Sequence, residues 1–201
     1  STLAPYTLEA VAYANWLEEN QPEAKVAMLV QDDDFGKAYE EGFKQQIEGS
    51  DITIKQVKTY KAGTDDVTAQ VTSLAASGDD TFFNGATLLA CPNALNAAQT
   101  AKWDAVTFVS GTCISKTLMG IAGDAANDVL ATTNIMDPLN PAFADNADMK
   151  EYFSTLKEYG ADDVDPENGI VAYGYTQGAL LVEILESLDT LDRSSLMNKM
   201  Y

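Results

Sequence analysis

The stretch VAMLVQDDDFGKAYEEGF, residues 26–43, decides how this sequence folds. Its first five residues are an apolar run of strand length, which is typical of a strand covered on both faces. Apolar or small residues then recur at intervals of three and four, as on one buried stripe of a helix. That stripe consists of Phe35, Ala38, Tyr39, Gly42, Phe43 and Ile47. The stretch therefore predicts a buried strand that passes directly into an amphipathic helix.

The same alternation continues on both sides of this stretch. Strand patterns occur at 51–60, 81–85, 105–111 and 128–136, and helical patterns at 5–19, 64–77, 93–103 and 115–123. The strand at 51–60 alternates, which indicates a sheet edge, and Thr64 is expected to cap the helix that follows it. Strands and helices that alternate in this way predict an α/β fold, a parallel sheet with helices on both faces.

The pattern changes after DPLNP, residues 137–141. Only helices are predicted beyond it, across 146–158 and 168–188, with a last one beginning near 192–195. The buried side of the long helix is expected to hold Tyr173, Leu180, Ile184 and Leu188. Helices without strands of their own must cover a sheet that this chain does not supply in full. We therefore expect these helices to expose apolar surface when the chain is alone, and a companion chain or a second copy to cover that surface.

The overall charge narrows the possible partners. Among 201 residues, 31 are acidic and 12 basic, which gives a net charge of −19. This charge excludes nucleic acid and anionic membrane as direct partners. The sequence also contains no His, so His-based zinc sites and His-dependent nucleophiles are excluded. No apolar run reaches the ~18 residues of a membrane span. The chain begins at Ser1, as a processed or excised piece would.

Three consecutive acids, Asp32 to Asp34, lie where the strand passes into the helix. They could hold a metal ion, contact a ligand, or cap the helix by accepting hydrogen bonds from its free N–H groups. The loop lacks the glycine and the later ligands of a calcium loop. An acid pocket like that of receiver domains would also need a Lys at the end of a later strand, and no predicted strand of this sequence ends in a Lys. We interpret the triplet as a strand-to-helix connection, with ligand contact as the alternative.

The two cysteines, Cys91 and Cys113, lie 22 positions apart and form no C-x-x-C motif. A metal site or a thioredoxin-like site therefore has little support. Two free buried thiols are expected if the protein is cytosolic, and a disulfide is expected if it is exported.

Four motifs in order resemble one known family. They are VQDDDFGKAYEEGFKQQIE, YKAGTDDVTAQVTSLAASGDDTFFNG, GIAGDAANDVLATTNIMDPLNPAFAD and AYGYTQGALLVEILESL. Together they resemble the type I periplasmic substrate-binding proteins, in the receptor group of the branched-chain amino-acid ABC transporters. The resemblance implies two α/β lobes joined by three hinge strands. Residues 1–136 would be mostly the second, C-terminal lobe, and residues 137–201 a crossing segment with helices of the first lobe, whose remainder is missing.

The resemblance also implies a function. An extracytoplasmic receptor of an ABC importer would capture a small polar molecule, an amino acid or a related small carboxylate, between two hinged lobes. It would deliver this molecule to a membrane permease, and it would be no enzyme and need no cofactor or metal. It would lie in the periplasm or outside the cell, where a lipid anchor could hold it at the cell surface. The alternatives are a ligand-sensing domain of a receptor or regulator on the same scaffold, a metalloenzyme using Asp32–Asp34, and a bare interaction module.

The resemblance places three loop positions of this sequence at the ligand, and Asp34 is added as a further candidate ligand-binding residue. Phe35 stands where relatives often carry Tyr, although it also begins the core stripe. Ala86 and Thr87 follow the strand at 81–85, and their small size suggests a roomy pocket. Thr112 stands where amino-acid binders usually place a carboxylate against the ligand's ammonium group. Asp34 is a candidate to replace that carboxylate, as are Asp33 and Asp65.

The resemblance also gives the cysteines a role. Cys91 and Cys113 would lie in loops at the carboxyl ends of adjacent parallel strands, and a disulfide between them would suit an exported protein. We therefore predict a Cys91–Cys113 disulfide.

Overall fold

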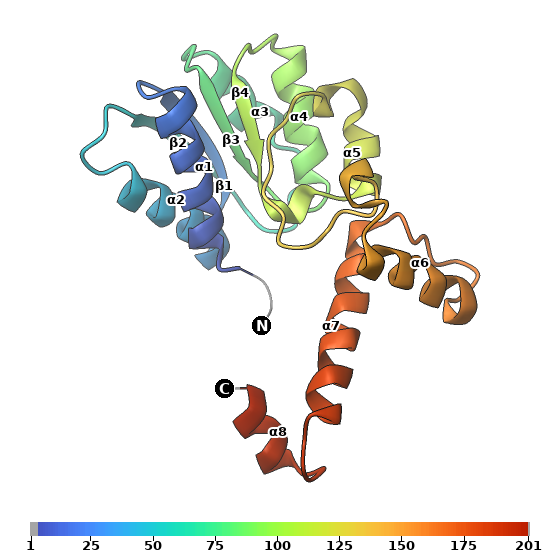
Figure 1. The fold of residues 1–201 in the computed structure, drawn as a ribbon. Coiled ribbons are helices and arrows are strands. Elements are labelled where there is room, and N and C mark those ends of the chain that lie inside the picture. Colours follow the sequence, from blue (N-terminus) through green and yellow to red (C-terminus); the bar gives the residue numbers. More distant parts are fainter. Residues whose placement is uncertain (1–3, 201) are drawn as a thin grey trace. The chain divides into compact units, whose positions relative to one another are not determined.

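The computed structural model describes residues 4–200 and divides them into two compact units, cut between Asn134 and Ile135 (Figure 1). The two units are described separately. The assignment of each unit to a lobe stays a prediction.

The first unit is built on a four-stranded parallel sheet. Its strands are β1 (Lys25–Gln31), β2 (Thr53–Tyr60), β3 (Thr81–Gly85) and β4 (Val106–Val109), in the order β2-β1-β3-β4. The strand predicted at 51–60 is an edge strand, as expected. Since β1 is paired on both sides, the apolar run 26–30 occupies the middle of the sheet, where it is fully buried.

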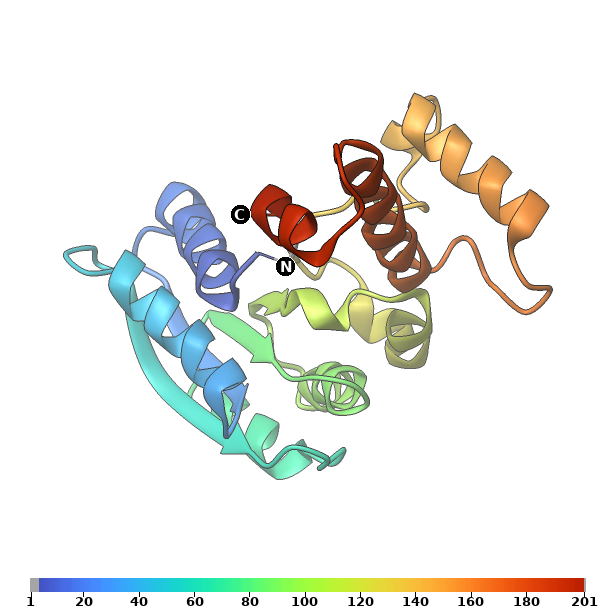
Figure 2. The same ribbon diagram turned by 90° about the horizontal axis from the view of Figure 1, so that it is seen from below.

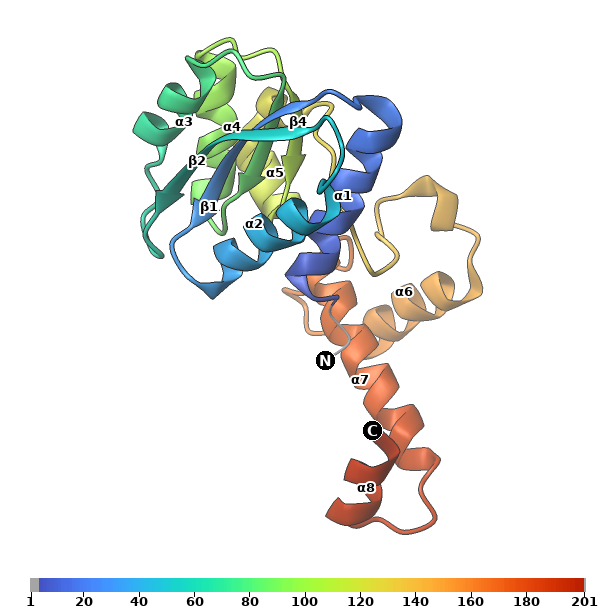
Figure 3. The ribbon, with the colours of Figure 1, turned by 90° about the vertical axis from the view of Figure 1, so that its left-hand side faces the viewer.

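Helices cover both faces of this sheet, as predicted (Figures 2 and 3). Val26, Met28 and Val30 pack with α1 (Tyr6–Asn20) and α2 (Asp34–Gln46). Ala27 and Leu29 point to the opposite face, since successive side chains of a strand alternate. The helices on that opposite face are α3 (Thr68–Ala75), α4 (Ala90–Thr100) and α5 (Lys116–Ala122). Short 3-10 turns lie before α5 at Gly111–Cys113 and directly after it at Gly123–Ala126.

Two predictions about this unit are wrong. The strand predicted at 128–136 is a single bridge between Leu130 and Phe108. The pairing stops there because the Thr132 N–H donates to the Tyr13 hydroxyl oxygen at 3.0 Å and not to a strand. Thr64 does not cap α3, because the N-cap position is occupied by Val67 and no side-chain cap hydrogen bond is formed there. The helix begins at Thr68, whose N–H donates to the Asp66 carboxylate at 3.0 Å.

The second unit, residues 135–200, contains helices and no strand. It consists of a 3-10 turn (Pro141–Phe143), α6 (Ala147–Tyr159), α7 (Gly169–Glu186) and α8 (Arg193–Met200). Its small core is Met149, Tyr152 and Ala172, so that α6 packs on the first turns of α7. No helix in the described part of the chain is long and apolar enough to cross a membrane.

Much of α7 is uncovered in this unit. Ile170 is 63% exposed, Leu181 46% and Val182 53%. Of the side chains predicted on its buried side, Leu180 is exposed, and Tyr173, Ile184 and Leu188 are only partly covered. The prediction of their burial is therefore wrong for this chain, because residues 135–200 supply no sheet for α7 to cover.

Candidate ligand-binding edge

The carboxyl ends of the four strands form one edge of the sheet. The strands end there at Gln31, Tyr60, Gly85 and Val109, and each leads into a loop. In open α/β sheets, ligands bind outside this edge. All five predicted ligand-binding residues lie on it: Asp34 and Phe35 in the first turn of α2, Ala86 and Thr87 after β3, and Thr112 after β4.

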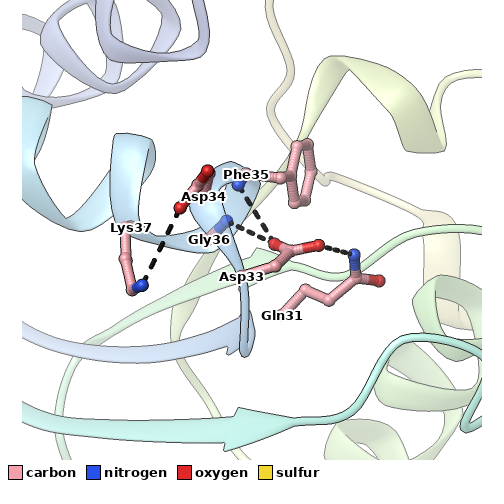
Figure 4. A network of polar contacts seen from close by, with 6 residues as sticks. All are labelled: Gln31, Asp33, Asp34, Phe35, Gly36 and Lys37. Atoms are coloured by element: carbon pink, nitrogen blue, oxygen red, sulfur yellow. Dashed lines mark hydrogen bonds and ion pairs between the residues drawn. The ribbon is translucent and has the colours of Figure 1, made fainter.

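The loop between β1 and α2 is fixed by Asp33 (Figure 4). One carboxylate oxygen of Asp33 accepts the N–H groups of Phe35 at 3.0 Å and Gly36 at 3.2 Å. The other oxygen accepts the side-chain amide of Gln31 at 2.5 Å. Asp33 is thus the N-cap of α2, and the interpretation of the triplet as a strand-to-helix connection is confirmed.

Asp34 points the other way from the same loop. Its carboxylate is fully exposed and lies 3.8 Å from the Lys37 ammonium, on the side away from the Phe35 ring (Figure 4). Gly36 lets the helix begin this close to β1, since a Cβ there would lie 2.0 Å from the Gln31 carbonyl oxygen. The fixed loop presents Phe35 and leaves Asp34 in solvent.

The Phe35 ring belongs to a cluster of three rings. Its centroid is 4.7 Å from that of Tyr6 and 5.2 Å from that of Tyr39, both edge-on. Tyr39 is fully buried, whereas Tyr6 and Phe35 are each half-buried. Phe35 therefore begins the core stripe of α2 and also keeps part of its ring exposed at the edge.

A second polar network joins the ends of β1, β2 and β3. The side-chain oxygen of Gln31 accepts the hydroxyl groups of Tyr60 and Thr87, each at 3.0 Å. The Tyr60 hydroxyl oxygen in turn accepts the Thr87 N–H at 2.9 Å. Burial raises the pKa of Tyr60, so the phenol stays protonated and can donate. Thr87 is thereby held in one position, half-buried, beside the exit of β1.

The loops after β3 and β4 are joined to each other. The buried Ser110 hydroxyl donates to the Ala86 carbonyl at 3.0 Å and lies 2.7 Å from the Thr112 hydroxyl. Cys91 and Cys113 form the predicted disulfide, with Cα atoms 6.1 Å apart. Ala86 is fully buried, so its carbonyl is a structural anchor, whereas Thr112 is exposed. The disulfide thus connects the segments that carry Thr87 and Thr112.

Sequence reasoning missed Glu9 on α1. One of its carboxylate oxygens accepts the Tyr39 hydroxyl at 2.6 Å and the Gly111 N–H at 3.0 Å. Burial, and then the hydrogen bond to Glu9, raise the pKa of Tyr39, so its hydroxyl remains a donor. The signal was its spacing, since Glu9 follows Tyr6 by three residues and precedes Tyr13 by four on a helix that begins at this edge.

The groups at this edge suit binding more than chemistry. They are hydroxyls, an amide, carboxylates and aromatic rings, which orient a small molecule. Residues 4–200 hold no group of three or more Cys, Asp or Glu arranged to bind a metal ion. A surface hollow of about 490 Å³ lies at the opposite end of β4, lined in part by Trp16, Trp103 and Val106. That hollow contains none of the five predicted residues.

The sheet order and the two helical layers define a doubly wound α/β unit whose strands all end at one edge, where polar and aromatic side chains gather. The sequence matches the family described as periplasmic binding protein over residues 1–201. The chain belongs to this periplasmic binding protein family. No curated protein matches it with significance.

Solved structures share the fold at low sequence identity. A branched-chain amino-acid ABC transporter protein from Thermus thermophilus, with bound valine, has 20% identity and a TM-score of 0.82, covering 96% of this chain and 51% of its own. A fatty-acid ABC transporter substrate-binding protein from Thermomonospora curvata has 20% identity and a TM-score of 0.78, with coverages of 98% and 51%. A solute-binding protein from R. palustris in complex with benzoate has 14% identity and a TM-score of 0.74, with coverages of 90% and 48%. The chain thus spans about half the length of these proteins.

Proposed function

We propose that this chain is part of an extracytoplasmic solute-binding receptor of an ABC importer. Residues 4–134 would form most of its second lobe, and residues 135–200 would cross to the first lobe and supply helices to it. The receptor would take up a small polar molecule, an amino acid or a related small carboxylate, between its two lobes. It would deliver that molecule to a membrane permease.

The observation that carries the proposal is the gathering of separate loops at one edge of the sheet. Phe35, Thr87 and Thr112 come from three loops that lie far apart in sequence, and all three are at least partly exposed there. Each is held by a named contact: Phe35 by the Asp33 cap, Thr87 by Gln31 and Tyr60, and Thr112 by Ser110. Such preorganised groups lower the entropy cost of binding a ligand.

The chemistry of this edge agrees with capture and release. A receptor needs a lobe-closing equilibrium that ligand contacts on both lobes shift, and it breaks no covalent bond. Membership of the family supports this role, as do solved relatives described as transporter proteins with bound valine or benzoate. Those relatives bind chemically different solutes, so the family alone does not select one.

Isothermal titration calorimetry on the receptor with both lobes present would test the proposal. The titrants are the common amino acids, benzoate, 4-methylpentanoate and octanoate. We expect heat of binding from at least one of them, weakened at least tenfold by Thr87→Trp, which fills the edge beside Gln31. The matched control is Thr72→Trp, at an exposed position of α3. Absence of binding across the whole panel would contradict the proposed function.

A further inference from the structure

Only one of the two oxygens of the Glu9 carboxylate accepts hydrogen bonds from the described residues. Both of its hydrogen bonds, from the Tyr39 hydroxyl and the Gly111 N–H, reach the same oxygen, Oε2. The other oxygen, Oε1, accepts no hydrogen bond from residues 4–200. Since no buried side-chain oxygen in that range lacks a partner, Oε1 is open to solvent.

This carboxylate is also fixed in position. Tyr39 is fully buried on α2, and Gly111 lies in the turn after β4, so Glu9 is held from two sides. Its side chain lies directly over Gly111, where a Cβ would be 2.9 Å from Oε1. Because the side chain is already held in one conformation, it loses little conformational entropy when a ligand binds. This favours tight pairing with a positively charged group.

Two other acids of the edge, Asp33 and Asp34, are not available in the same way. Both oxygens of Asp33 are occupied by the cap of α2 and by Gln31. Asp34 is fully exposed beside Lys37, where water and the nearby cation screen its charge. Thr112 brings only a hydroxyl, which already pairs with Ser110. No Lys or Arg of the described range forms an ion pair with Glu9.

The surroundings of Glu9 suit an organic cation better than a metal ion. Calcium takes six to eight oxygen ligands, and Oε1 is a single one. Tyr39, which donates to Glu9, lies in contact with the half-buried rings of Tyr6 and Phe35, with centroids 5.6 Å and 5.2 Å away. Aromatic faces and a carboxylate together attract an amine.

We infer that Glu9 is the specificity-determining residue of this edge and pairs with a positively charged amine of the ligand. This inference rests on the proposed function and deepens it. The bound solute then carries an amine, as an amino acid does, and a plain carboxylate such as benzoate is a poor ligand.

The test is the substitution Glu9→Gln in the receptor with both lobes present. The amide oxygen replaces Oε2 and keeps both hydrogen bonds, while the amide NH₂ replaces Oε1 and removes the charge. The titrants are amine-bearing solutes (the common amino acids, putrescine and choline) and the amine-free acids benzoate, 4-methylpentanoate and octanoate. The control is Glu18→Gln, the same charge change at an exposed position of α1.

We expect an amine-bearing solute to bind, with affinity about 10- to 100-fold weaker in Glu9→Gln and unchanged in Glu18→Gln. An unchanged melting temperature in Glu9→Gln would show that the fold is intact. If Glu9→Gln binds the amine as tightly as the wild type, or if only amine-free acids bind, the inference is wrong while the proposed function stands. If no solute of either set binds, the proposed function fails and the inference with it.

Discussion

The two units of this chain differ in whether their layers are complete. In residues 4–134, helices cover both faces of the sheet, and large side chains of these helices, such as Leu17, Tyr39 and Phe43, are fully buried. In residues 135–200, α6 covers only the first turns of α7, and the apolar side chains beyond them are exposed. The same kind of apolar helix sequence is thus stable core in one unit and uncovered surface in the other, because only one unit supplies a sheet.

The largest expected effect tests this difference directly. Phe83→Ala removes a fully buried ring whose centroid lies 5.0 Å from that of Tyr39 and 5.4 Å from that of Phe43. We expect the free energy of unfolding of the first unit to fall by about 3–5 kcal/mol. Urea unfolding followed by tryptophan fluorescence reports on this unit alone, because both tryptophans, Trp16 and Trp103, lie in it.

The matched substitution in the second unit is Leu181→Ala, at a side chain that is 46% exposed. We expect a change within about 0.5 kcal/mol, measured by circular dichroism at 222 nm. Comparable losses in Phe83→Ala and Leu181→Ala would refute the contrast between the units.

The disulfide should give the next largest effect. Cys91 and Cys113 close a loop of 22 residues within the first unit, and the chain-entropy account assigns about 3 kcal/mol to such a loop. We expect the double variant Cys91→Ser, Cys113→Ser to lose about that much in urea unfolding followed by fluorescence. The control is a pair of wild-type unfolding curves, one measured with reductant and one without. Coincident unfolding curves for the double variant and the non-reduced wild type would argue against a stabilising disulfide.

Alkaline pH should weaken the first unit through Tyr13. Burial raises the pKa of this tyrosine from 10.0 to about 12. The folded state therefore holds the proton more tightly, so its contribution is complete below pH 10 and is lost as the pH rises through 12. Between pH 10 and pH 12 we expect the free energy of unfolding of the first unit to fall by about 2 kcal/mol in the wild type and by less in Tyr13→Phe. The control is Tyr159→Phe in the second unit: unfolding followed by the fluorescence of Trp16 and Trp103, which both lie in the first unit, should show the same pH profile as the wild type.

The smallest expected effect concerns a feature that the two units share. Asp33 caps α2 and Asn168 caps α7 with its side-chain oxygen, and neither cap depends on a covering layer. Asp33→Ala and Asn168→Ala should each cost about 1 kcal/mol in helix stability, measured by thermal unfolding. Asp34→Ala, at a carboxylate that caps nothing, should cost almost nothing. A larger loss in Asp34→Ala than in Asp33→Ala would reverse the assignment of the cap.

The features that sequence predicted best are those fixed by short-range patterns. The apolar run 26–30 predicted a central strand because it is buried along its whole length, and the stripe from Phe35 predicted a helix because one face of that helix packs into the core, where Tyr39 and Phe43 are fully buried. The strand predicted at 128–136 failed at Thr132, where a side chain 119 residues away in sequence takes the backbone N–H. No local pattern around Thr132 contains that partner.

The candidate site was predictable to the same extent. The strand ends indicated which loops meet, so Phe35, Thr87 and Thr112 were placed at one edge. Glu9 was missed because its partners, Tyr39 and Gly111, lie 30 and 102 positions away. An acid on an amphipathic helix is ordinarily a solvent-exposed residue, so the spacing of Glu9 from Tyr6 and Tyr13 was too weak a signal without these tertiary contacts.

The central claim is that the carboxyl edge of the sheet in residues 4–134 binds the ligand of a two-lobe receptor. A crystal structure of that receptor with a bound solute tests it most directly. The account predicts density for the solute in contact with Phe35, Thr87 and Thr112. A solute bound instead in the hollow at the opposite end of β4, beside Trp16 and Trp103, would contradict it.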